Sequence, residues 1–291
     1  MNDSEIVDKI RRYLSPPDAM SNLDYDTSKE SIVAQLIAEK IKSLGDEDNL
    51  SILDVGCGKA SILTMLKSED KFKDDTHKLF YHGIDMNNDY ICQLKYLEDQ
   101  DKETKWKINP LFTTCGVLDY RPEENEFYDI ILVLNFIHEF DPAYLPELFI
   151  KLNQMLKTDG VIIIVDMENL PFGEEESQSI CFNRAEIKEI LISAGVKSAP
   201  ITHKKRVNLW SLSVQKSDII DEEKCIKKIK TTLENKLDNM MNKYNLRIVS
   251  TERKWDNDYI YEWICLTSHI CQLNACLRNI KSKFDGNNNQ K

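Results

Sequence analysis

The sequence has little of what marks the specialised classes of protein. Only nine glycines and eight prolines occur among its 291 residues, which excludes collagen-like and low-complexity chains. It contains no uninterrupted apolar run of the roughly 18 residues that a membrane span needs. Its first residues also lack the basic and apolar regions of a signal peptide. We therefore expect a cytoplasmic globular protein that has no membrane partner.

Ordered cysteine spacing and excess positive charge are also missing. The eight cysteines include neither a C-x-x-C pair nor a histidine at zinc-finger spacing, so we expect reduced thiols and no metal site. The 49 Asp and Glu residues outnumber the 38 Lys and Arg residues and give a net charge of -11. A surface of this sign disfavours DNA as a partner and favours small molecules or basic partners.

Hydrophobic periodicity first predicts helices and then a sheet. Two amphipathic helices are expected before residue 45, over 4–14 and 27–44, the second with the Thr-x-x-Glu spacing of a capping box. Short, wholly apolar strands then alternate with helices, which is typical of a parallel sheet that is covered on both faces. The predicted strands are 51–55, 79–85, 111–115, 128–134 and 161–166, and the predicted helices among them are 60–68, 88–99 and 143–157. This α/β series predicts a doubly wound sheet.

The end of the chain follows a different pattern. A helix over 183–193 and an antiparallel edge hairpin of strands 198–205 and 207–215 are expected to close the sheet. Two long helical stripes follow and predict a C-terminal helical hairpin. This tail carries a net charge of +2, against -13 for the first 216 residues. We therefore divide the chain into an N-terminal helical segment (1–45), a sheet domain (46–216) and a C-terminal helical extension (217–291).

A glycine loop at the end of the first strand carries the strongest chemical signal. Gly56 and Gly58 lie where a helix begins. Glycine allows the backbone to approach a ligand closely, and a helix N-terminus offers N–H groups to a carboxylate or phosphate. The second strand ends at Asp85, where a carboxylate is suited to bind two ribose hydroxyls. Together these features predict an adenosine-containing cofactor at the carboxyl ends of the strands.

Four motifs, in order and spacing, resemble those of the class I S-adenosylmethionine-dependent methyltransferases. They are Asp54-Val-Gly-Cys-Gly58, Asp85, the segment Phe127–Glu139, and Leu156-Lys-Thr-Asp-Gly160 with the apolar strand after it. The resemblance covers roughly residues 30–216. It implies S-adenosyl-L-methionine as the cofactor and a Rossmann-like, mostly parallel sheet of seven strands with an antiparallel last strand. A dinucleotide dehydrogenase is the competing interpretation, but it favours a third glycine where this chain has Ser61.

The resemblance also implies roles for individual residues. Residues of the glycine loop would hold the methionine end of the donor: Asp54, Gly56, Cys57 and Gly58. Asp85 would bind the ribose, and Met86 would lie against the adenine. Asn135 and Phe136 would line the pocket between the donor and the acceptor.

Two positions depart from the family's pattern. Ala60 stands where a third glycine is usual. The acidic residue that accepts the adenine amine is represented by Asp119, and a register through Gly116 is the alternative.

His138 and Glu139 are the candidate catalytic residues. Their segment is similar to the His-Asp-Trp-Ser-Asp stretch of plant-type small-molecule O-methyltransferases, in which the histidine is a general base. Tuned by Glu139 and Asp141, His138 would deprotonate a hydroxyl or an amine. The alternative is a histidine that only packs or caps the next helix.

Three hypotheses of function follow. The first is an S-adenosylmethionine-dependent methyltransferase that modifies an O or N atom of a small molecule. The second is a protein or RNA methyltransferase that recruits its acceptor through the C-terminal helices. The third is a non-catalytic module that binds the donor. Neither Asn-Pro-Pro-Tyr nor Asp-Pro-Pro-Tyr follows the fourth strand, which disfavours base methylation of DNA.

Overall fold

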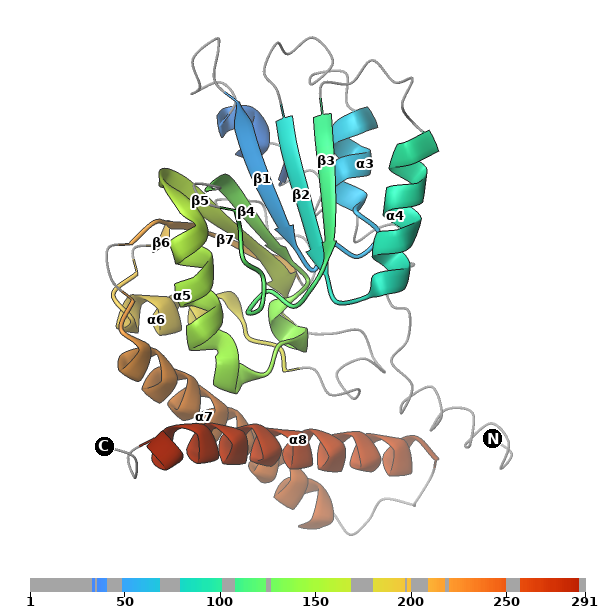
Figure 1. Ribbon diagram of the computed structural model, residues 1–291. Helices are drawn as coiled ribbons and strands as arrows, with labels where there is room; N and C mark the ends of the chain where they lie inside the picture. The colour runs from blue at the N-terminus through green and yellow to red at the C-terminus, as the bar shows by residue number, and fades with distance from the viewer. Residues whose placement is uncertain are drawn as a thin grey trace.

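A seven-stranded sheet with the strand order β3-β2-β1-β4-β5-β7-β6 forms the centre of the protein (Figure 1). The computed structural model describes residues 33–34, 36–40, 49–68, 79–100, 108–123, 127–168, 180–196, 198–199, 209–217, 220–249 and 257–287. The strands are β1 (Leu50–Val55), β2 (Leu79–Asp85), β3 (Ile108–Thr114), β4 (Tyr128–Leu134), β5 (Leu156–Met167), β6 (Ser198–Ala199) and β7 (Leu209–Gln215).

Strand direction fixes where a ligand can bind. Strands β1 to β5 run parallel, and β7 pairs antiparallel with β5 and β6. The predicted doubly wound sheet with an antiparallel edge is therefore confirmed. The strand order reverses between β1 and β4, and open α/β sheets bind ligands at the carboxyl ends of the strands at such a switch point.

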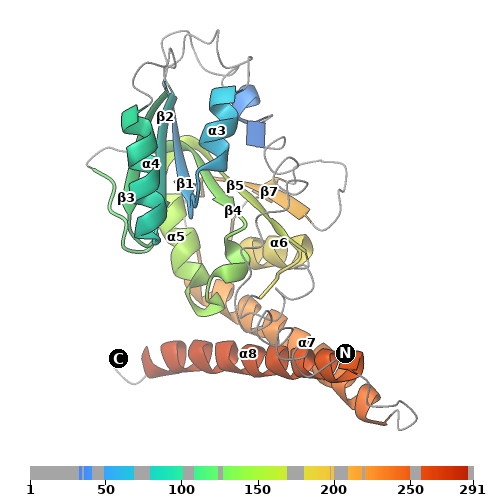
Figure 2. The same ribbon diagram turned by 90° about the vertical axis from the view of Figure 1, so that its right-hand side faces the viewer.

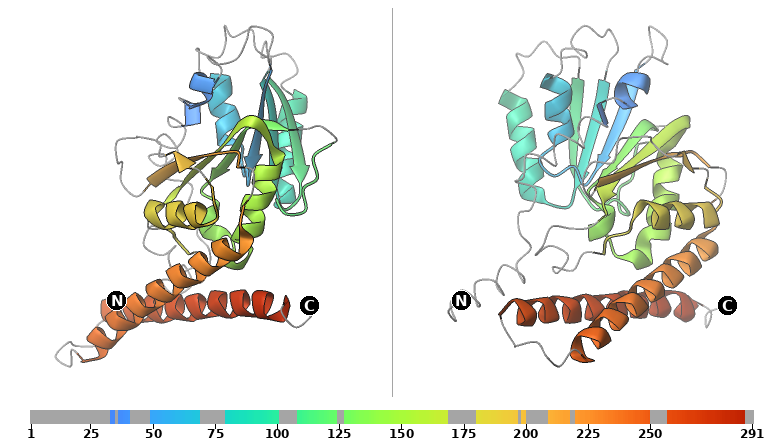
Figure 3. Two further views of the ribbon diagram at one scale, coloured as in Figure 1. Left: turned by 90° about the vertical axis from the view of Figure 1, so that its left-hand side faces the viewer. Right: turned by 180° about the vertical axis from the view of Figure 1, so that it is seen from behind.

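Helices cover both faces of the sheet, as the apolar strands require. They are α3 (Ser61–Ser68), α4 (Asn88–Gln100), α5 (Leu145–Met155), α6 (Arg184–Ser193), α7 (Glu222–Val249) and α8 (Asn257–Asn287), with the 3-10 turns η3 (Ile137–Glu139) and η4 (Pro142–Tyr144). Within β1, Leu53 and Val55 pack in the core shared with α5 and α6, whereas Leu50 and Ile52 pack in the core shared with α3 and α4. Figure 3 shows the α3–α4 side in front when the molecule is seen from behind.

The C-terminal helices form the expected hairpin. The rings of Tyr244 in α7 and Trp263 in α8 lie 6.3 Å apart. Both helices also contribute to the core around α5 and α6, through Ile229 of α7 and through Leu273 and Ile280 of α8. In Figures 1 and 2, α8 lies across the end of the sheet toward which β1 and β2 point. No described helix combines the length and apolar character that a membrane span requires.

The boundary between α5 and β5 differs from the prediction. The helix predicted over 143–157 is the turn η4 followed by α5, and β5 begins five residues earlier than the apolar run 161–166 suggests. The apolar pattern missed this part because residues 157–159 are polar and exposed. A Cβ at Gly160 would lie 2.8 Å from the carbonyl oxygen of Tyr128, so the tight pairing with β4 requires glycine here.

Some predicted elements extend beyond the described residues. The helix predicted over 4–14 lies wholly outside them. Of the helix predicted over 27–44, residues 33–34 and 36–40 are described and are helical. Of the strand predicted over 198–205, only Ser198–Ala199 is described as a strand.

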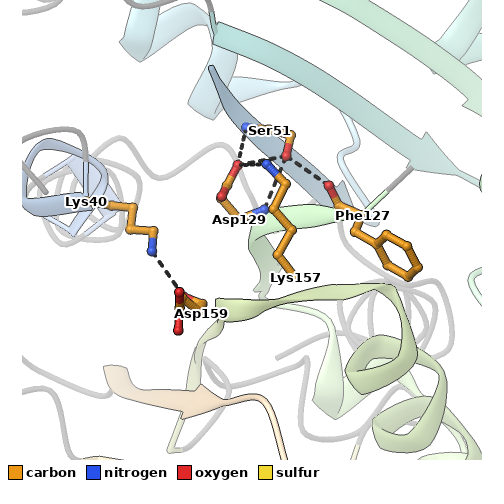
Figure 4. A network of polar contacts seen from close by, with 6 residues as sticks. All are labelled: Lys40, Ser51, Phe127, Asp129, Lys157 and Asp159. Carbon is orange, nitrogen blue, oxygen red and sulfur yellow. Dashed lines mark hydrogen bonds and ion pairs between the residues drawn. The ribbon is translucent and has the colours of Figure 1, made fainter. Parts of the chain in front are cut away.

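A buried carboxylate joins three parallel strands at the end opposite to their carboxyl termini (Figure 4). Asp129 of β4 accepts hydrogen bonds on Oδ2 from the backbone N–H and the hydroxyl of Ser51 in β1, each 2.9 Å long. Lys157 Nζ of β5 lies 2.7 Å from the same oxygen. Asp129 is 7% exposed, so it depends on these partners for the hydrogen bonds that water would otherwise supply. The contacts fix the register of β1, β4 and β5.

We expect Asp129→Ala to lower the free energy of unfolding by about 2–3 kcal/mol, because the partly buried N–H of Ser51 loses its charged acceptor. Lys157 is 43% exposed, and Lys157→Met should therefore cost less than about 1 kcal/mol. Urea denaturation of both variants measures the difference. Equal losses would show that the ion pair, rather than the hydrogen bonds to Ser51, is the stabilising contact.

Candidate functional site

The glycine loop after β1 and the end of β2 form one site. The Gly56 N–H donates a hydrogen bond to the carbonyl oxygen of Ile84 over 2.9 Å. The Gly58 N–H donates to Asp85 Oδ2 over 2.8 Å, and the Asn87 N–H donates to Asp85 Oδ1 over 2.7 Å. The glycine loop and the end of β2, which lie 27 residues apart in the sequence, are thus joined by a direct hydrogen bond.

The loop has a left-handed backbone at three positions. The φ angles of Gly56, Gly58 and Ala60 are +66°, +50° and +52°. Ala60 therefore keeps the backbone shape that its glycine counterpart would adopt, at a cost of roughly 1–2 kcal/mol of steric strain. The departure from the family's pattern therefore falls at a position whose backbone conformation favours glycine.

The two glycines of the loop should respond differently to alanine. A Cβ at Gly58 would meet nothing within 4 Å, whereas a Cβ at Gly56 would lie 2.6 Å from Cδ2 of Phe136. We expect Gly58→Ala to cost about 1 kcal/mol of stability through backbone strain alone. Gly56→Ala should cost about 2–4 kcal/mol because it adds a steric overlap to the strain. Thermal unfolding compares the pair, and equal losses would contradict the close approach of Phe136.

Asp54 and Cys57 are buried beneath the loop. Asp54 Oδ2 accepts a 2.5 Å hydrogen bond from the Tyr81 hydroxyl. Burial, together with the charge of Asp54, raises the pKa of Tyr81 well above its usual value, so Tyr81 remains a donor. Burial and the carboxylates of Asp54 and Asp85 also raise the pKa of the Cys57 thiol. Cys57 is therefore a protonated packing residue and a poor nucleophile.

Met86 and Asp119 both lie close to Gly116. A Cβ at Gly116 would be 3.4 Å from Asp119 Oδ2 and 3.8 Å from Met86 Sδ. Met86 is 79% exposed, and Asp119 is exposed as well. The structure thus brings an apolar side chain and a carboxylate together at the segment that follows β3, whose Cys115 N–H donates to the carbonyl oxygen of Asp85. The two alternatives for the adenine contact, Asp119 and Gly116, are neighbours.

The segment after β4 lies against the glycine loop. Asn135 has a φ of +51°, and its N–H donates to the carbonyl oxygen of Val165 over 2.8 Å. This turn directs Phe136 onto Gly56. The Phe136 and Phe140 rings lie 5.4 Å apart and give the segment an apolar surface. Residues predicted for the donor and for the acceptor side therefore lie side by side.

His138 is paired with Asp166, which the sequence analysis did not identify. The imidazole Nδ1 lies 2.5 Å from Asp166 Oδ1, and the backbone N–H of His138 donates to Asp166 Oδ2 over 3.2 Å. The two side chains are 6% and 2% exposed. Because a carboxylate accepts hydrogen bonds, Nδ1 carries the proton and Nε2 is the nitrogen that can take up another.

The two other carboxylates near His138 differ in what they contact. Glu139 Oε1 lies 3.8 Å from His138 Nε2, and the side chain is exposed. Partial desolvation, and more weakly the charges of Asp166 and Asp85, raise the pKa of Glu139, while His138 opposes the shift. Asp141 instead caps η4 by accepting a 2.9 Å hydrogen bond from the Ala143 N–H.

The His, Cys, Asp and Glu side chains of the described residues are dispersed. Within the described ranges, no three His, Cys, Asp or Glu side chains form a group that could hold a metal ion. All eight cysteines belong to these ranges and are free thiols.

This sheet order, with a glycine loop after β1 and an acidic residue at the end of β2, defines a class I methyltransferase fold. A family model described as a methyltransferase domain matches residues 46–272. The chain belongs to this methyltransferase family, which confirms the family predicted from the four motifs. The match extends beyond residue 216 and takes in α7 and half of α8.

Comparison with individual proteins gives more distant similarities. The chain is 26% identical over 117 residues to N-terminal Xaa-Pro-Lys N-methyltransferase 1 of Ailuropoda melanoleuca, which covers 39% of this chain and 49% of that protein. The match thus spans about half the length of that relative.

Solved methyltransferase structures are similar to this chain at low sequence identity. The CurJ carbon methyltransferase superposes with a TM-score of 0.52 at 14% identity, over 65% of this chain and 54% of that one. The magnesium protoporphyrin IX methyltransferase of Synechocystis PCC 6803, solved with bound SAH, has a TM-score of 0.48 at 16% identity, over 74% and 95% of the two chains.

Proposed function

We propose that the protein is an S-adenosylmethionine-dependent methyltransferase that modifies an O or N atom of a small molecule. The observation that carries this proposal is the buried His138–Asp166 pair, because it stands at the same edge of the sheet as the glycine loop and Asp85. Membership of the methyltransferase family supports the class of reaction.

The residues at this edge fit the donor. Gly58 borders open space, so a ligand can approach its backbone. Asp85 would bind the ribose hydroxyls, as acidic residues at the end of a second strand do. The exposed Met86 and Asp119 would receive the adenine ring and its amine, which explains an apolar side chain left 79% exposed.

The methionine end of the donor would lie over the loop that Asp54 and Tyr81 support from below. When bound, the donor supplies an electrophilic methyl group on a sulfonium, which needs an acceptor lone pair in line with it. The apolar rings of Phe136 and Phe140 would exclude water from this side of the pocket.

His138 would act as the general base. Asp166 holds the Nδ1 proton, so the lone pair lies on Nε2, and a proton leaving the acceptor oxygen or nitrogen would pass to it. The carboxylate of Asp166 would then stabilise the imidazolium. Glu139, close to Nε2 and exposed, is in a position to hold the acceptor's hydrogen-bonding group.

The choice of a small molecule rests on the charge of the protein. A net charge of -11 disfavours DNA and RNA. A protein acceptor is the second candidate, because the relative from Ailuropoda melanoleuca is named for an N-terminal peptide motif. A cytoplasmic location is supported by the eight free thiols.

Transfer of a labelled methyl group separates these candidates. The full chain is incubated with methyl-labelled S-adenosylmethionine and with the small-molecule, protein and RNA fractions of a cell extract, with heat-denatured protein as the blank. We expect label in the small-molecule fraction. Label in the protein fraction would favour the second candidate, and label in the RNA fraction would overturn the charge argument. Binding of the donor without transfer to any fraction would indicate a non-catalytic module.

A further inference from the structure

Helix α8 contacts the segment that follows His138, although the two are more than 130 residues apart in the sequence. Lys283 Nζ lies 3.1 Å from the carbonyl oxygen of Ala143 and 2.7 Å from Glu147 Oε1. The same ammonium group lies 3.7 Å from the centre of the Tyr144 ring. Three different groups of η4 and α5 are therefore bound by one side chain that is only 20% exposed.

A second contact lies one helical turn away on α8. Asn279 Nδ2 donates a 3.2 Å hydrogen bond to Asp141 Oδ2. The other carboxylate oxygen of Asp141 accepts from the Ala143 N–H. Asn279 and Lys283 are thus spaced i and i+4 on one face of α8, and together they bind both ends of η4.

The short segment between His138 and η4 is held by backbone hydrogen bonds. The Glu139 N–H donates to the carbonyl oxygen of Phe136, and the Phe140 N–H donates to that of Ile137, so η3 is a closed turn. Asp141 follows at once. On the other side, Asp166 binds both the ring and the backbone N–H of His138. The turn that carries His138 and Glu139 is therefore held by β5 at one end and by α8 at the other.

Helix α8 is itself firmly anchored. Leu273 and Ile280 are buried in the core that includes α5 and α7, and Leu277 and Phe284 pack against it. Packing of this kind makes a helix a rigid support for the polar groups along its edge. The helix also lies at the end of the sheet where β1 and β2 terminate (Figure 2).

We propose that Lys283 and Asn279 are positioning residues, through which α8 fixes the turn bearing His138 and Glu139 against the donor edge of the sheet. This inference rests on the proposed function of His138. It gives the C-terminal helices a part in every turnover, whatever the acceptor, instead of a role confined to recruiting a large one.

Lys283→Met in the full chain tests the proposal, with Lys281→Met as the matched control because Lys281 is exposed on the same helix. Loss of the contacts that Lys283 makes with η4 and α5 should raise hydrogen exchange in residues 135–147 about tenfold, because local opening of the turn becomes easier. Carbethoxylation of His138 by diethyl pyrocarbonate should accelerate, with the equally buried His82 as internal reference. Affinity for S-adenosylhomocysteine should stay within about twofold, because these contacts do not reach the glycine loop.

Turnover provides the functional readout. On the fraction that accepts labelled methyl, Lys283→Met should lower kcat about tenfold with an unchanged KM for the donor, because the reacting groups are misplaced and the donor is not. Lys283→Arg should restore most of kcat. Asn279→Ala is the second variant if Lys283→Met does not fold, and a smaller rise in exchange over the same residues is expected.

Unchanged exchange over residues 135–147 in both variants would overturn the proposal. A rise spread evenly over the whole chain would also overturn it, because it would show that Lys283 only stabilises the fold. If instead His138→Gln retained full turnover, the proposed base would be wrong. The hydrogen-exchange result would still show whether Lys283 and Asn279 hold the turn in place.

Discussion

Replacing His138 with glutamine should lower kcat by about 10²- to 10³-fold, which is the range typical of losing a positioned general base. Glutamine keeps the size and a hydrogen-bonding group but cannot take up a proton at neutral pH. Because the side chain of His138 contacts Asp166 and Glu139 rather than the glycine loop, affinity for S-adenosylhomocysteine should remain within about twofold. Single-turnover transfer and calorimetry measure the two quantities separately.

His82→Gln is the matched control for that experiment. His82 is also 6% exposed, but its ring nitrogens contact the Tyr128 hydroxyl and the Thr113 hydroxyl within the sheet. Its replacement should reduce stability and leave kcat nearly unchanged. Asp166→Asn should resemble His138→Gln in direction, since a neutral amide beside Nδ1 no longer supplies the negative charge that stabilises a protonated His138. Near-normal turnover of His138→Gln would show that His138 only packs against Asp166.

Asp85→Ala should weaken binding of S-adenosylmethionine and S-adenosylhomocysteine about 100-fold or more. Two hydrogen bonds from ribose hydroxyls to a carboxylate are worth about 1.5–3 kcal/mol each, and about 1.4 kcal/mol corresponds to tenfold in affinity. The variant also removes the acceptor for the N–H groups of Gly58 and Asn87, so the glycine loop loses its tie to β2.

Asp89→Asn provides the control for Asp85. Asp89 lies four residues further on, in the first turn of α4. Its replacement by asparagine removes the same charge from the same edge of the sheet. Affinity should change less than about threefold, because an exposed charge is screened by water and salt. Equal losses in the two variants would show that Asp85 acts through its charge alone, and unchanged affinity in Asp85→Ala would remove the ribose assignment.

Local sequence patterns predicted the central strands β1 and β4 well because they are buried on both faces and are therefore mostly apolar. The run Ile130–Leu134 could be interpreted without any knowledge of its neighbours. The part of β5 before Val161 could not, since its polar residues are held by pairing with β4 and by the fit of Gly160.

The candidate site also contains residues that local sequence identifies and residues that only the folded structure brings together. Asp54, the glycines and Asp85 are motif residues, and their placement at strand ends made them recognisable. Asp166 was missed because its link to His138 depends on the register of β4 and β5, in which Leu134 pairs with Val165. A polar residue directly after a long apolar run was the available signal. The contacts of Asn279 and Lys283 had no such signal, since only the packing of α8 brings them to η4.

A crystal structure of the protein with S-adenosylhomocysteine would test the central claim most directly. The account predicts that the ribose hydroxyls contact Asp85, that the adenine lies between Met86 and Asp119, and that the sulfur faces the side of the pocket formed by Phe136 and His138. A ligand bound away from the carboxyl ends of β1 and β2, or a sulfur facing away from His138, would contradict it.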